Sequence, residues 1–489
     1  MPICKIVIQD EVNCKILDLS LDARKKLMKT FKYQIPGARY QPSVRLGRWD
    51  GCANFFTLGG GTYINLLPEI IPILEEYNYD FEIEDLRDYR TSFEFDEVDA
   101  HLFSHIIWGE GHRLEGQPIT LNDHQVVVVN EFLRNPQSLS EAATGAGKTV
   151  VTAALSHSVE KYGRSIVIVP NKSLVTQTED DYLMVGLDVG VYYGERKDIG
   201  KKHTICTWQS LNNVIKATKD GSADVPIGEF IEDVVCVIVD ESHQAKADVL
   251  KMMLSGPFSK VPIRWGLTGT IPKEKFAEVT LRVCLGEVVS KVSASHLQEL
   301  GHLSRCHVNV LQLKDYGEYK NYQEELGYLV KNVKRLKYIA NRITRIKESG
   351  NTLVLVDRRA TGDELVRVLT EMGVKSVFVN GSTKAIKRKE EYTNFRYEDG
   401  TVIVATYGVA SVGISIDRIF NLVLIEPGKS FVRVIQSIGR GLRRAVDKDY
   451  VDIWDITSTC KYSKRHLTAR KAFYKDAEYP FTIDKVEWN

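Results

Sequence analysis

The sequence predicts an α/β protein with two parallel sheets in tandem, preceded by a small mixed α/β domain. From about residue 116, short β-branched runs alternate with helical stretches, and a charged connector divides these runs into two blocks. Uninterrupted apolar strands are typical of parallel sheets that helices cover on both faces. We therefore expect two α/β lobes with a cleft between them. The runs of the two blocks are "SIVIVP", "HTICT", "VVCVIVDE" and "IRWGLTGT", then "TLVLVD", "SVFVN", "TVIVATY", "NLVLIEP" and "DYVDIWDI".

The first 115 residues lack this alternation and predict the small domain. "CKIVIQ" and "NCKILDL" are typical of short strands, and Ser20 is placed to cap a helix over residues 21–31. Residues 52–67, "CANFFTLGGGTYINLL", predict a hairpin around a glycine turn.

Length and composition set the domain count and the class of protein. At about 150 residues per domain, 489 residues predict three domains. We expect them at 1–115, 116–305 and 306–489, the last with the connector, whose second half has helical periodicity, and a basic tail. The net charge of +1 excludes neither nucleic acids nor small substrates as partners. The eight cysteines form no C-x-x-C pair, so neither a zinc module nor a disulfide framework is expected.

Two features of the chain favour a soluble, cytoplasmic protein without membrane contact. The first residues alternate apolar and polar side chains and include Asp10 and Glu11, where a signal peptide needs an apolar run. No later apolar run approaches the roughly 20 residues that cross a bilayer.

The stretch "EAATGAGKTVVTAAL", residues 141–155, predicts a phosphate-binding loop between a strand and a helix. Gly145 and Gly147 let the backbone curve around phosphate, where N–H groups of the helix start favour an anion. Lys148 would neutralise the β- and γ-phosphates, and Thr149 would offer a hydroxyl to Mg²⁺. The first glycine of the usual pattern is Ala142 here, so a glycine-rich helix start without a ligand is the alternative.

Two further clusters carry the chemistry of nucleotide hydrolysis. Asp240 and Glu241 close an apolar strand, where the first could hold Mg²⁺ through water and the second could polarise the attacking water. In "QSIGRGLRR", helical spacing puts Gln436, Arg440 and Arg443 near one face, and arginines there would stabilise the charge of the transition state. A solvated strand end and a solvated basic helix are the alternatives.

Taken in order, these and other motifs resemble a superfamily 2 helicase or translocase with two RecA-like lobes, over roughly residues 116–460. The departure at Ala142 is ordinary in that family, and "DESH" favours its DNA-directed branch over the DEAD-type RNA helicases. Within that branch, "ARYQPSVRLGRWDG", "ATYGVASVGISI" and "IQSIGRGLR" resemble the UvsW type of phage branch-migration helicase. The motifs are "LNDHQ", "ATGAGKT", "VPNKSLVTQ", "TWQS", "DESH", "LTGT", "TLVLVDRR", "ATYGVASVGISI" and "QSIGRGLRR".

The resemblance implies ATP and Mg²⁺ as ligands and assigns roles to the matching residues. ATP would be bound by Gln125, at the adenine, and by Thr144, Gly145, Gly147, Lys148, Thr149, Asp240 and Gln436, with Mg²⁺ on Thr149 and Asp240. Lys148, Glu241, Arg440 and Arg443 would act in hydrolysis, the two arginines reaching across the cleft. The coupling of nucleotide state to movement would involve Thr268, Thr270, Gly413, Asp417 and His243. DNA would contact Pro170, Lys172, Thr207, Gln209 and Thr406, although Thr207 and Gln209 are equally suited to structural roles.

Three basic stretches add candidate DNA contacts. In the N-terminal domain, Arg45, Arg48 and Trp49 combine charge with an aromatic ring, which suits phosphate contact and base stacking. The alternatives there are salt bridges for the arginines and a tryptophan in the small core beside an Asp50–Gly51 turn. Residues 330–347, with seven cations and no acid, and residues 460–475 either track a phosphate backbone or form solvated faces.

The sequence therefore favours an ATP-dependent DNA helicase that remodels forks and four-way junctions in phage replication, recombination and repair. It would work as a monomer on DNA, in the cytoplasm of the host cell if the gene belongs to a phage. An RNA helicase or RNA-stimulated ATPase is one alternative, and a nucleotide-gated clamp that binds nucleic acid without unwinding it is the other.

Overall fold

The computed structural model describes residues 2–87, 93–109, 114–242, 247–383, 385–410, 416, 418–428, 442, 445 and 447–488. Contacts divide the chain into two compact units. The first contains residues 1–142 and 147–291, and the second contains residues 143–146 and 292–489.

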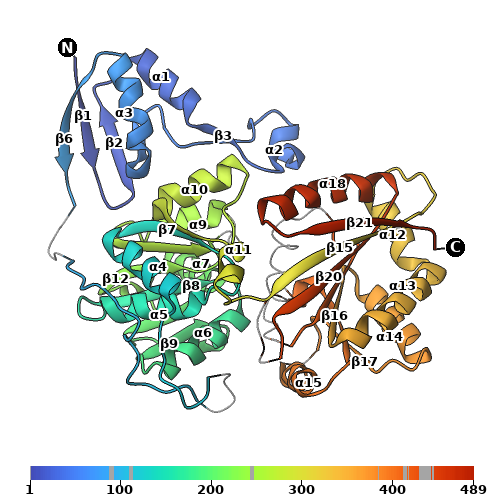
Figure 1. Cartoon of the computed structure of the whole chain (residues 1–489). Coiled ribbons are helices and arrows are strands. Elements are labelled where there is room, and N and C mark those ends of the chain that lie inside the picture. The colour runs from blue at the N-terminus through green and yellow to red at the C-terminus, as the bar shows by residue number, and fades with distance from the viewer. Residues whose placement is uncertain are drawn as a thin grey trace. The chain divides into compact units, whose positions relative to one another are not determined.

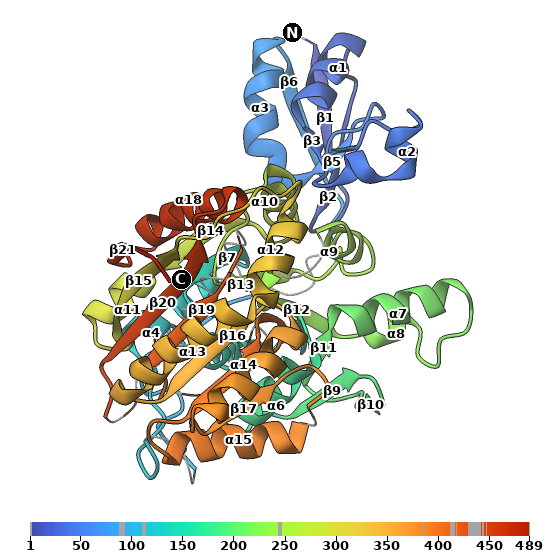
Figure 2. The same cartoon turned by 90° about the vertical axis from the view of Figure 1, so that its right-hand side faces the viewer.

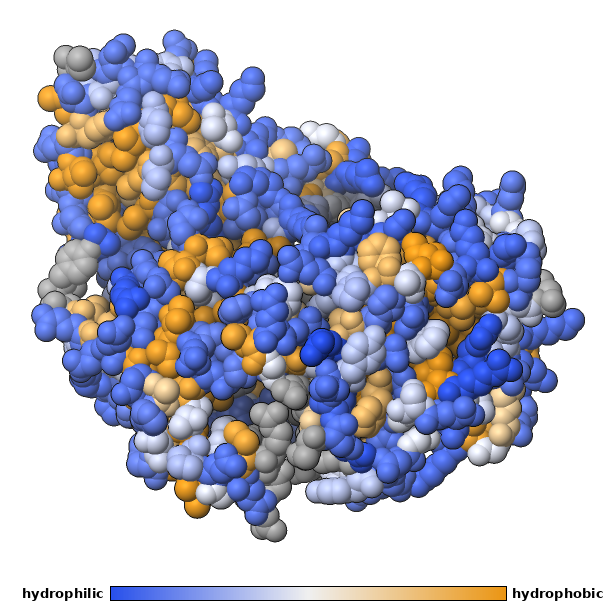
Figure 3. Space-filling view, in the orientation of Figure 1, coloured by the Kyte–Doolittle hydropathy of each residue, from blue (hydrophilic) through white to orange (hydrophobic). Residues whose placement is uncertain are grey.

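The N-terminal domain, at the start of the first unit, is built on a four-stranded mixed sheet in the order β5-β2-β1-β6 (Figure 1). Strand β1 is antiparallel to β2 and parallel to β6. Apolar residues gather over these strands on the surface (Figure 3). The elements are β1 (Ile3–Ile8), β2 (Asn13–Leu17), α1 (Leu21–Thr30), β3 (Lys32–Gln34), α2 (Pro42–Arg45), β4 (Cys52–Asn54), β5 (Gly61–Tyr63), α3 (Leu67–Glu76) and β6 (Asp80–Asp85).

Two local predictions for this domain have opposite outcomes. Ser20 caps α1 as predicted, because its side chain accepts a hydrogen bond of 3.2 Å from the Ala23 N–H. The hairpin predicted for residues 52–67 is wrong. The chain does turn there, with the Thr57 N–H bonded to the Gly61 carbonyl, but β4 pairs with β3 and β5 pairs with β2, in different sheets. The turn depends on the local sequence, whereas the strands on either side of it pair with strands that are distant in sequence.

The larger sheet of the first unit has eight strands in the order β10-β9-β11-β8-β12-β13-β7-β14. Its central pairs are parallel. Helices α4, α5 and α6 cover one face, and α7, α9 and α10 cover the other (Figure 1). The strands are β7 (Gln137–Ala142), β8 (Arg164–Val169), β9 (Val189–Tyr193), β10 (Arg196–Lys197), β11 (His203–Thr207), β12 (Val234–Val239), β13 (Ile263–Thr268) and β14 (Glu287–Val292). The helices are α4 (Asp123–Arg134), α5 (Lys148–Val159), α6 (Lys172–Met184), α7 (Trp208–Lys219), α8 (Ile227–Phe230), α9 (Ala247–Leu254) and α10 (Lys275–Leu285).

The second unit contains a seven-stranded sheet in the order β17-β18-β16-β19-β20-β15-β21. Its paired strands are parallel, α13 and α14 pack on one face, and α18 packs on the other through β20 (Figure 2). Its strands are β15 (Arg305–Leu313), β16 (Thr352–Val356), β17 (Ser376–Val379), β18 (Val402–Thr406), β19 (Asn421–Ile425), β20 (Tyr450–Ser458) and β21 (Phe481–Val486). Its helices are α11 (Ala294–Glu299), α12 (Tyr322–Lys331), α13 (Val333–Ile346), α14 (Arg359–Glu371), α15 (Ala385–Tyr397), α16 (Tyr407–Ala410) and α18 (Lys461–Asp476).

The predicted fold class is confirmed, since two large parallel sheets follow a small mixed sheet. The apolar runs of both predicted blocks are strands, and several of them, such as β16 and β19, are buried on both faces. Strand β17 is mostly half-buried, and the first part of β20 alternates buried residues with more exposed ones. In the two large sheets the prediction did not include β9, β10, β14, β15 and β21. Strand β15 alternates buried and half-buried residues over its first part, and β21 alternates half-buried and exposed ones. All eight cysteines are free, and among the described residues no helix is long and apolar enough to span a membrane.

The N-terminal domain contacts helix α9 of the first unit and the loop that follows it. The Asn13 side chain donates to the Ser255 carbonyl at 2.9 Å, and the Glu11 N–H donates to the Ser259 carbonyl at 2.9 Å. The Lys251 ammonium lies 3.9 Å from the centre of the Phe55 ring. Polar and aromatic contacts together therefore attach the small domain to the loops around α9.

Candidate nucleotide site

The predicted phosphate loop connects β7 to α5, the strand–loop–helix context that such a loop requires. Gly145 and Gly147 have φ angles of +94° and +74°, in the left-handed region that glycine adopts without strain. A Cβ atom on Gly147 would lie 2.1 Å from Gln125 Nε2, so this position also has no room for a side chain. Helix α5 begins at Lys148, so its free N–H groups follow the loop directly.

The predicted carboxylates follow β12 at the same edge of the sheet. Asp240 is held by its N–H, which donates to the Ile168 carbonyl of the neighbouring strand at 2.9 Å. The Glu241 N–H turns back to Asp240 Oδ1 at 2.8 Å. Glu241 has a φ of +49°, which is uncommon for a residue with a side chain, and such backbone conformations are enriched at functional sites.

Lys148 joins the phosphate loop to these carboxylates. Its Nζ lies 3.1 Å from Glu241 Oε1, and the two side chains are only 9% and 13% exposed. Nζ also donates to the Ala142 carbonyl at 3.3 Å. This last contact was not predicted, because a backbone carbonyl leaves no signature in a sequence. Three residues from three segments thus converge in a space shielded from water.

The side chains of this cluster include more acidic groups than basic ones. The pKa of Asp240 is raised to about 7, chiefly by burial and then by the neighbouring Glu241 carboxylate, while Lys148 lowers it in part. Two carboxylates and one ammonium share the site, so a further positive charge beside Asp240 would favour its ionised form. A second cation would supply that charge.

Gln125 lies in the first turn of α4 and reaches the phosphate loop. Its Oε1 accepts a hydrogen bond of 2.8 Å from the Asn122 N–H in a capping box, which fixes the amide. Its Nε2 is the atom that approaches Gly147 so closely. The structure therefore brings this residue to the loop, while its contact with adenine stays a prediction.

Thr268 and Thr270 follow β13, which lies between β12 and β7 in the sheet. The Thr268 hydroxyl donates to the Thr270 carbonyl at 2.8 Å, and both residues are buried. The carboxyl ends of parallel strands meet at one edge of a sheet, so these threonines lie at the edge that carries Asp240 and the phosphate loop.

The residues predicted to contact DNA in the first unit follow β8 and β11, which are neighbours. Lys172 opens α6, and the Gln209 side chain donates to the Pro170 carbonyl at 3.4 Å. Thr207 is only 4% exposed, and its hydroxyl caps α7 by accepting from the Ser210 N–H at 3.2 Å. These contacts favour the structural alternative for Thr207.

In the second unit, Thr406 is half-buried at the end of β18. Six predicted residues fall outside the described residues. They are His243 in the first unit, and Gly413, Asp417, Gln436, Arg440 and Arg443 in the second.

Comparison with known proteins shows to which protein family the two large sheets belong. Two family descriptions match the chain, "Type III restriction enzyme, res subunit" over residues 118–273 and "Helicase conserved C-terminal domain" over residues 332–445. The chain is a superfamily 2 helicase. Its two large sheets are the RecA-like lobes of that superfamily, and the predicted resemblance is confirmed.

Relatives agree with this assignment over most of the chain. The ATP-dependent DNA helicase uvsW of enterobacteria phage T4 is 25% identical over 466 residues, which cover 92% of this chain and 89% of that protein. Two solved structures share the fold. The ATP-dependent type ISP restriction-modification enzyme LlaBIII matches 87% of this chain and 36% of its own, with 15% identity and a TM-score of 0.58. The Mycobacterium smegmatis helicase Lhr matches 74% of this chain and 49% of its own, with 15% identity and a TM-score of 0.51.

The N-terminal arginines of the helicase stand on its surface. Arg45 and Arg48 are exposed, whereas Trp49 is half-buried and its indole N–H donates to the Cys52 carbonyl at 3.0 Å. Asp50 accepts from the Cys52 N–H at 2.9 Å, which makes the turn considered for this stretch. The side chains of the two arginines are therefore accessible to a ligand, whereas the tryptophan side chain already donates a hydrogen bond within the turn.

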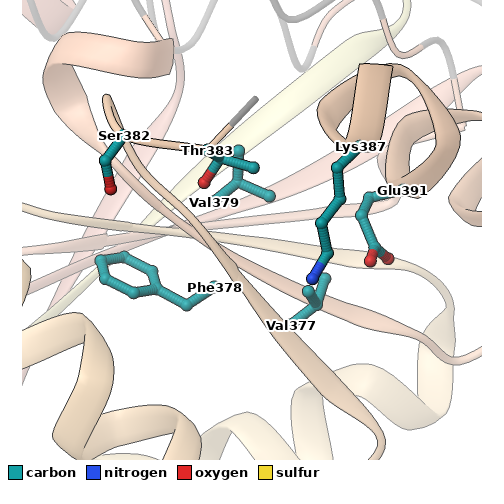
Figure 4. Close-up of a pocket in the computed structure, with 7 residues that line it drawn as sticks. All are labelled: Val377, Phe378, Val379, Ser382, Thr383, Lys387 and Glu391. Carbon is teal, nitrogen blue, oxygen red and sulfur yellow. The ribbon is translucent and has the colours of Figure 1, made fainter. Parts of the chain in front are cut away.

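The helicase also has a cavity of about 320 Å³ in its second unit, between the end of β17 and α15 (Figure 4). Its lining contains none of the residues predicted to bind ATP. The side chains that line it are Val377, Phe378, Val379, Ser382, Thr383, Lys387 and Glu391.

Proposed function

We propose that this ATP-dependent helicase moves on DNA and remodels branched DNA such as forks and four-way junctions. The observation that carries the proposal is the buried contact of 3.1 Å between Lys148 and Glu241, beside Asp240 and next to the phosphate loop. The choice of DNA is supported by the name of the phage T4 relative, an ATP-dependent DNA helicase similar to 92% of this chain.

At the nucleotide, each side chain of the first lobe has a proposed task. Lys148 would exchange its contact with Glu241 for the β- and γ-phosphates of ATP, which frees that carboxylate to orient the attacking water. The Thr149 hydroxyl and the Asp240 carboxylate, hard oxygen donors with surplus negative charge, fit Mg²⁺. A bound Mg²⁺ would neutralise charge on the phosphate oxygens during transfer. Gln125, Thr144, Gly145 and Gly147 would hold the adenine and the phosphates.

The remaining residues would connect hydrolysis to movement. Gln436, Arg440 and Arg443 would stabilise the transferred phosphoryl group, Arg443 most directly. Coupling would use Thr268, Thr270, His243, Gly413 and Asp417.

Contacts to phosphates rather than to bases would make the helicase insensitive to DNA sequence. In the lobes these contacts would come from Pro170, Lys172, Gln209 and Thr406. We assign Thr207 to the cap of α7 instead. In the N-terminal domain, residues 1–115, the exposed Arg45 and Arg48 would hold duplex DNA, with Trp49 beside them.

The proposal is tested by ATPase rates of the full chain at low salt with DNA and with RNA of matched sequence. We expect DNA to stimulate hydrolysis, and forks and four-way junctions to stimulate it more than linear single strands or duplexes. Stimulation by RNA alone would identify an RNA helicase. No stimulation by any DNA would overturn the proposal. A nucleotide-gated clamp would bind DNA with ATP but leave forks and junctions unchanged.

A further inference from the structure

We propose that the exposed face of α18 is a second nucleic-acid-binding surface of the helicase, which contacts the phosphate backbone outside the motifs of the two lobes. The inference rests on the proposed function and adds a site to it. Figure 1 shows α18 on the outside of the second unit.

The cations of α18 form one stripe. At about 100° per residue, five basic side chains fall within roughly 120° of the helix circumference, over a length of about 21 Å. The buried residues Leu467, Arg470 and Tyr474 lie on the opposite side. The stripe contains Lys461, Lys464, Arg465, Lys471 and Lys475, of which Lys471 is half-buried and the others are exposed.

These five cations make no ion pair with any described residue, whereas other exposed lysines, such as Lys197 and Lys375, do pair with a carboxylate. The equally basic α13 differs. Its Arg335 is buried between Asp315 and Glu426. The pKa of Glu364 on α14 is lowered, chiefly by its hydrogen bond with Arg367 and to a smaller extent by Lys337 of α13. The stripe on α18 forms no ion pair within the described part of the unit, although the Glu325 carboxylate lies at the N-terminal end of the helix.

The position of three of the cations is unfavourable for the helix itself. Lys461, Lys464 and Arg465 lie at the N-terminal end of α18, where the helix dipole repels positive charge, and they stand three and four residues apart, where like charges repel. A ligand with negative charge beside these cations would offset the repulsion.

The helix is held so that this face stays exposed. Glu325 of α12 accepts from the N–H groups of Tyr462 and Ser463 at 2.9 and 2.6 Å, which caps the N-terminus with a buried carboxylate. Farther along, Arg470 pairs with Asp455 of β20 at 2.8 Å. These buried contacts fix the orientation of α18, so that its basic stripe faces the solvent.

Aromatic rings beside the stripe favour nucleic acid over an acidic protein segment. The ring of Tyr322, on α12, lies 4.4 Å from that of His466 on α18. Tyr462 is half-buried on α18, and the Lys461 ammonium of the stripe lies 5.8 Å from the centre of the Tyr462 ring. Aromatic side chains next to cations are the usual combination on surfaces that bind single strands, because bases stack on the rings while cations follow the phosphates.

The test compares two triple variants of the full chain with equal loss of charge. One is Lys461→Gln/Lys464→Gln/Arg465→Gln, and the control on α13 is Lys334→Gln/Lys337→Gln/Arg345→Gln. Binding to a labelled oligothymidine and to a hairpin duplex is measured by fluorescence anisotropy over a series of salt concentrations. The thermal midpoint and the ATPase rate without nucleic acid are measured alongside.

We expect the α18 variant to bind more weakly, and its plot of log Kd against log salt to lose about 2 in slope for the single strand or about 3 for the duplex. Its thermal midpoint should stay equal or rise, its basal ATPase rate should not change, and the α13 control should keep the slope of the unaltered chain. An unchanged slope in the α18 variant with both probes would overturn the inference, as would an equal loss in the control. Loss of binding to polyglutamate but not to nucleic acid would also overturn it. If the unaltered chain binds neither the oligothymidine nor the hairpin duplex, the proposed function itself is overturned, and this inference with it.

Discussion

Replacement of Gly147 by alanine tests whether the phosphate loop has in this structure the shape that binds ATP. Gly147 has a φ of +74°, and a side chain in this left-handed region costs about 1–2 kcal/mol. The new Cβ would also lie 2.1 Å from Gln125 Nε2, so the glutamine must move. That movement breaks its cap on Asn122, a hydrogen bond worth about 0.5–1.5 kcal/mol.

The loop of the variant can relax while it is empty, and ATP must then restore the strained shape. The two contributions sum to about 1.5–3.5 kcal/mol, so the Kd for ATP should rise by about tenfold to 300-fold. Anisotropy of a fluorescent ATP analogue measures the change. Gly186→Ala is the matched control, because Gly186 has a φ of +77° and open space around its Cβ position, away from the site. ATP affinity equal to that of the unaltered chain in Gly147→Ala would refute the reasoning.

Two further predictions concern stability. Arg470→Met should lower the free energy of unfolding by about 3–5 kcal/mol in urea titrations, because among the described residues it leaves the fully buried Asp455 carboxylate with the Tyr474 hydroxyl as its one hydrogen-bond donor. The double variant with Asp455→Asn should lose less than Arg470→Met alone, and a loss below about 1 kcal/mol in the single variant would contradict the account. Thr207→Ala should cost about 0.5–2 kcal/mol as a lost helix cap while the Kd for oligothymidine stays within twofold; a larger loss of affinity would make Thr207 a DNA contact.

The sequence was sufficient for the features that depend on local pattern. Strands such as β16 and β19 are uninterrupted apolar runs, and parallel strands buried on both faces need such runs. The phosphate loop between a strand and a helix, and the two carboxylates that follow a buried strand, were also visible in the sequence, and the structure has β7, α5 and β12 at these places.

Features that depend on distant partners could not be predicted. The turn before Gly61 was visible, but the pairing of its strands with β3 and β2 was not. Arg335 and Arg470 belong to basic runs that look solvated, yet both are fully buried in ion pairs with residues far along the chain. A run of basic residues does not show which of its side chains points into the core. It also does not show which carboxylate pairs with that side chain.

We propose that ATP hydrolysis at Glu241 drives the remodelling of DNA. The most direct measurement follows ATP hydrolysis and the conversion of a four-way junction in one reaction, for the unaltered chain and for Glu241→Gln. We expect the unaltered chain to convert the junction as it consumes ATP. The variant should bind ATP with similar affinity while its hydrolysis rate falls by about 10²–10⁴ and conversion stops. Junction conversion by Glu241→Gln at the rate of the unaltered chain would contradict the claim.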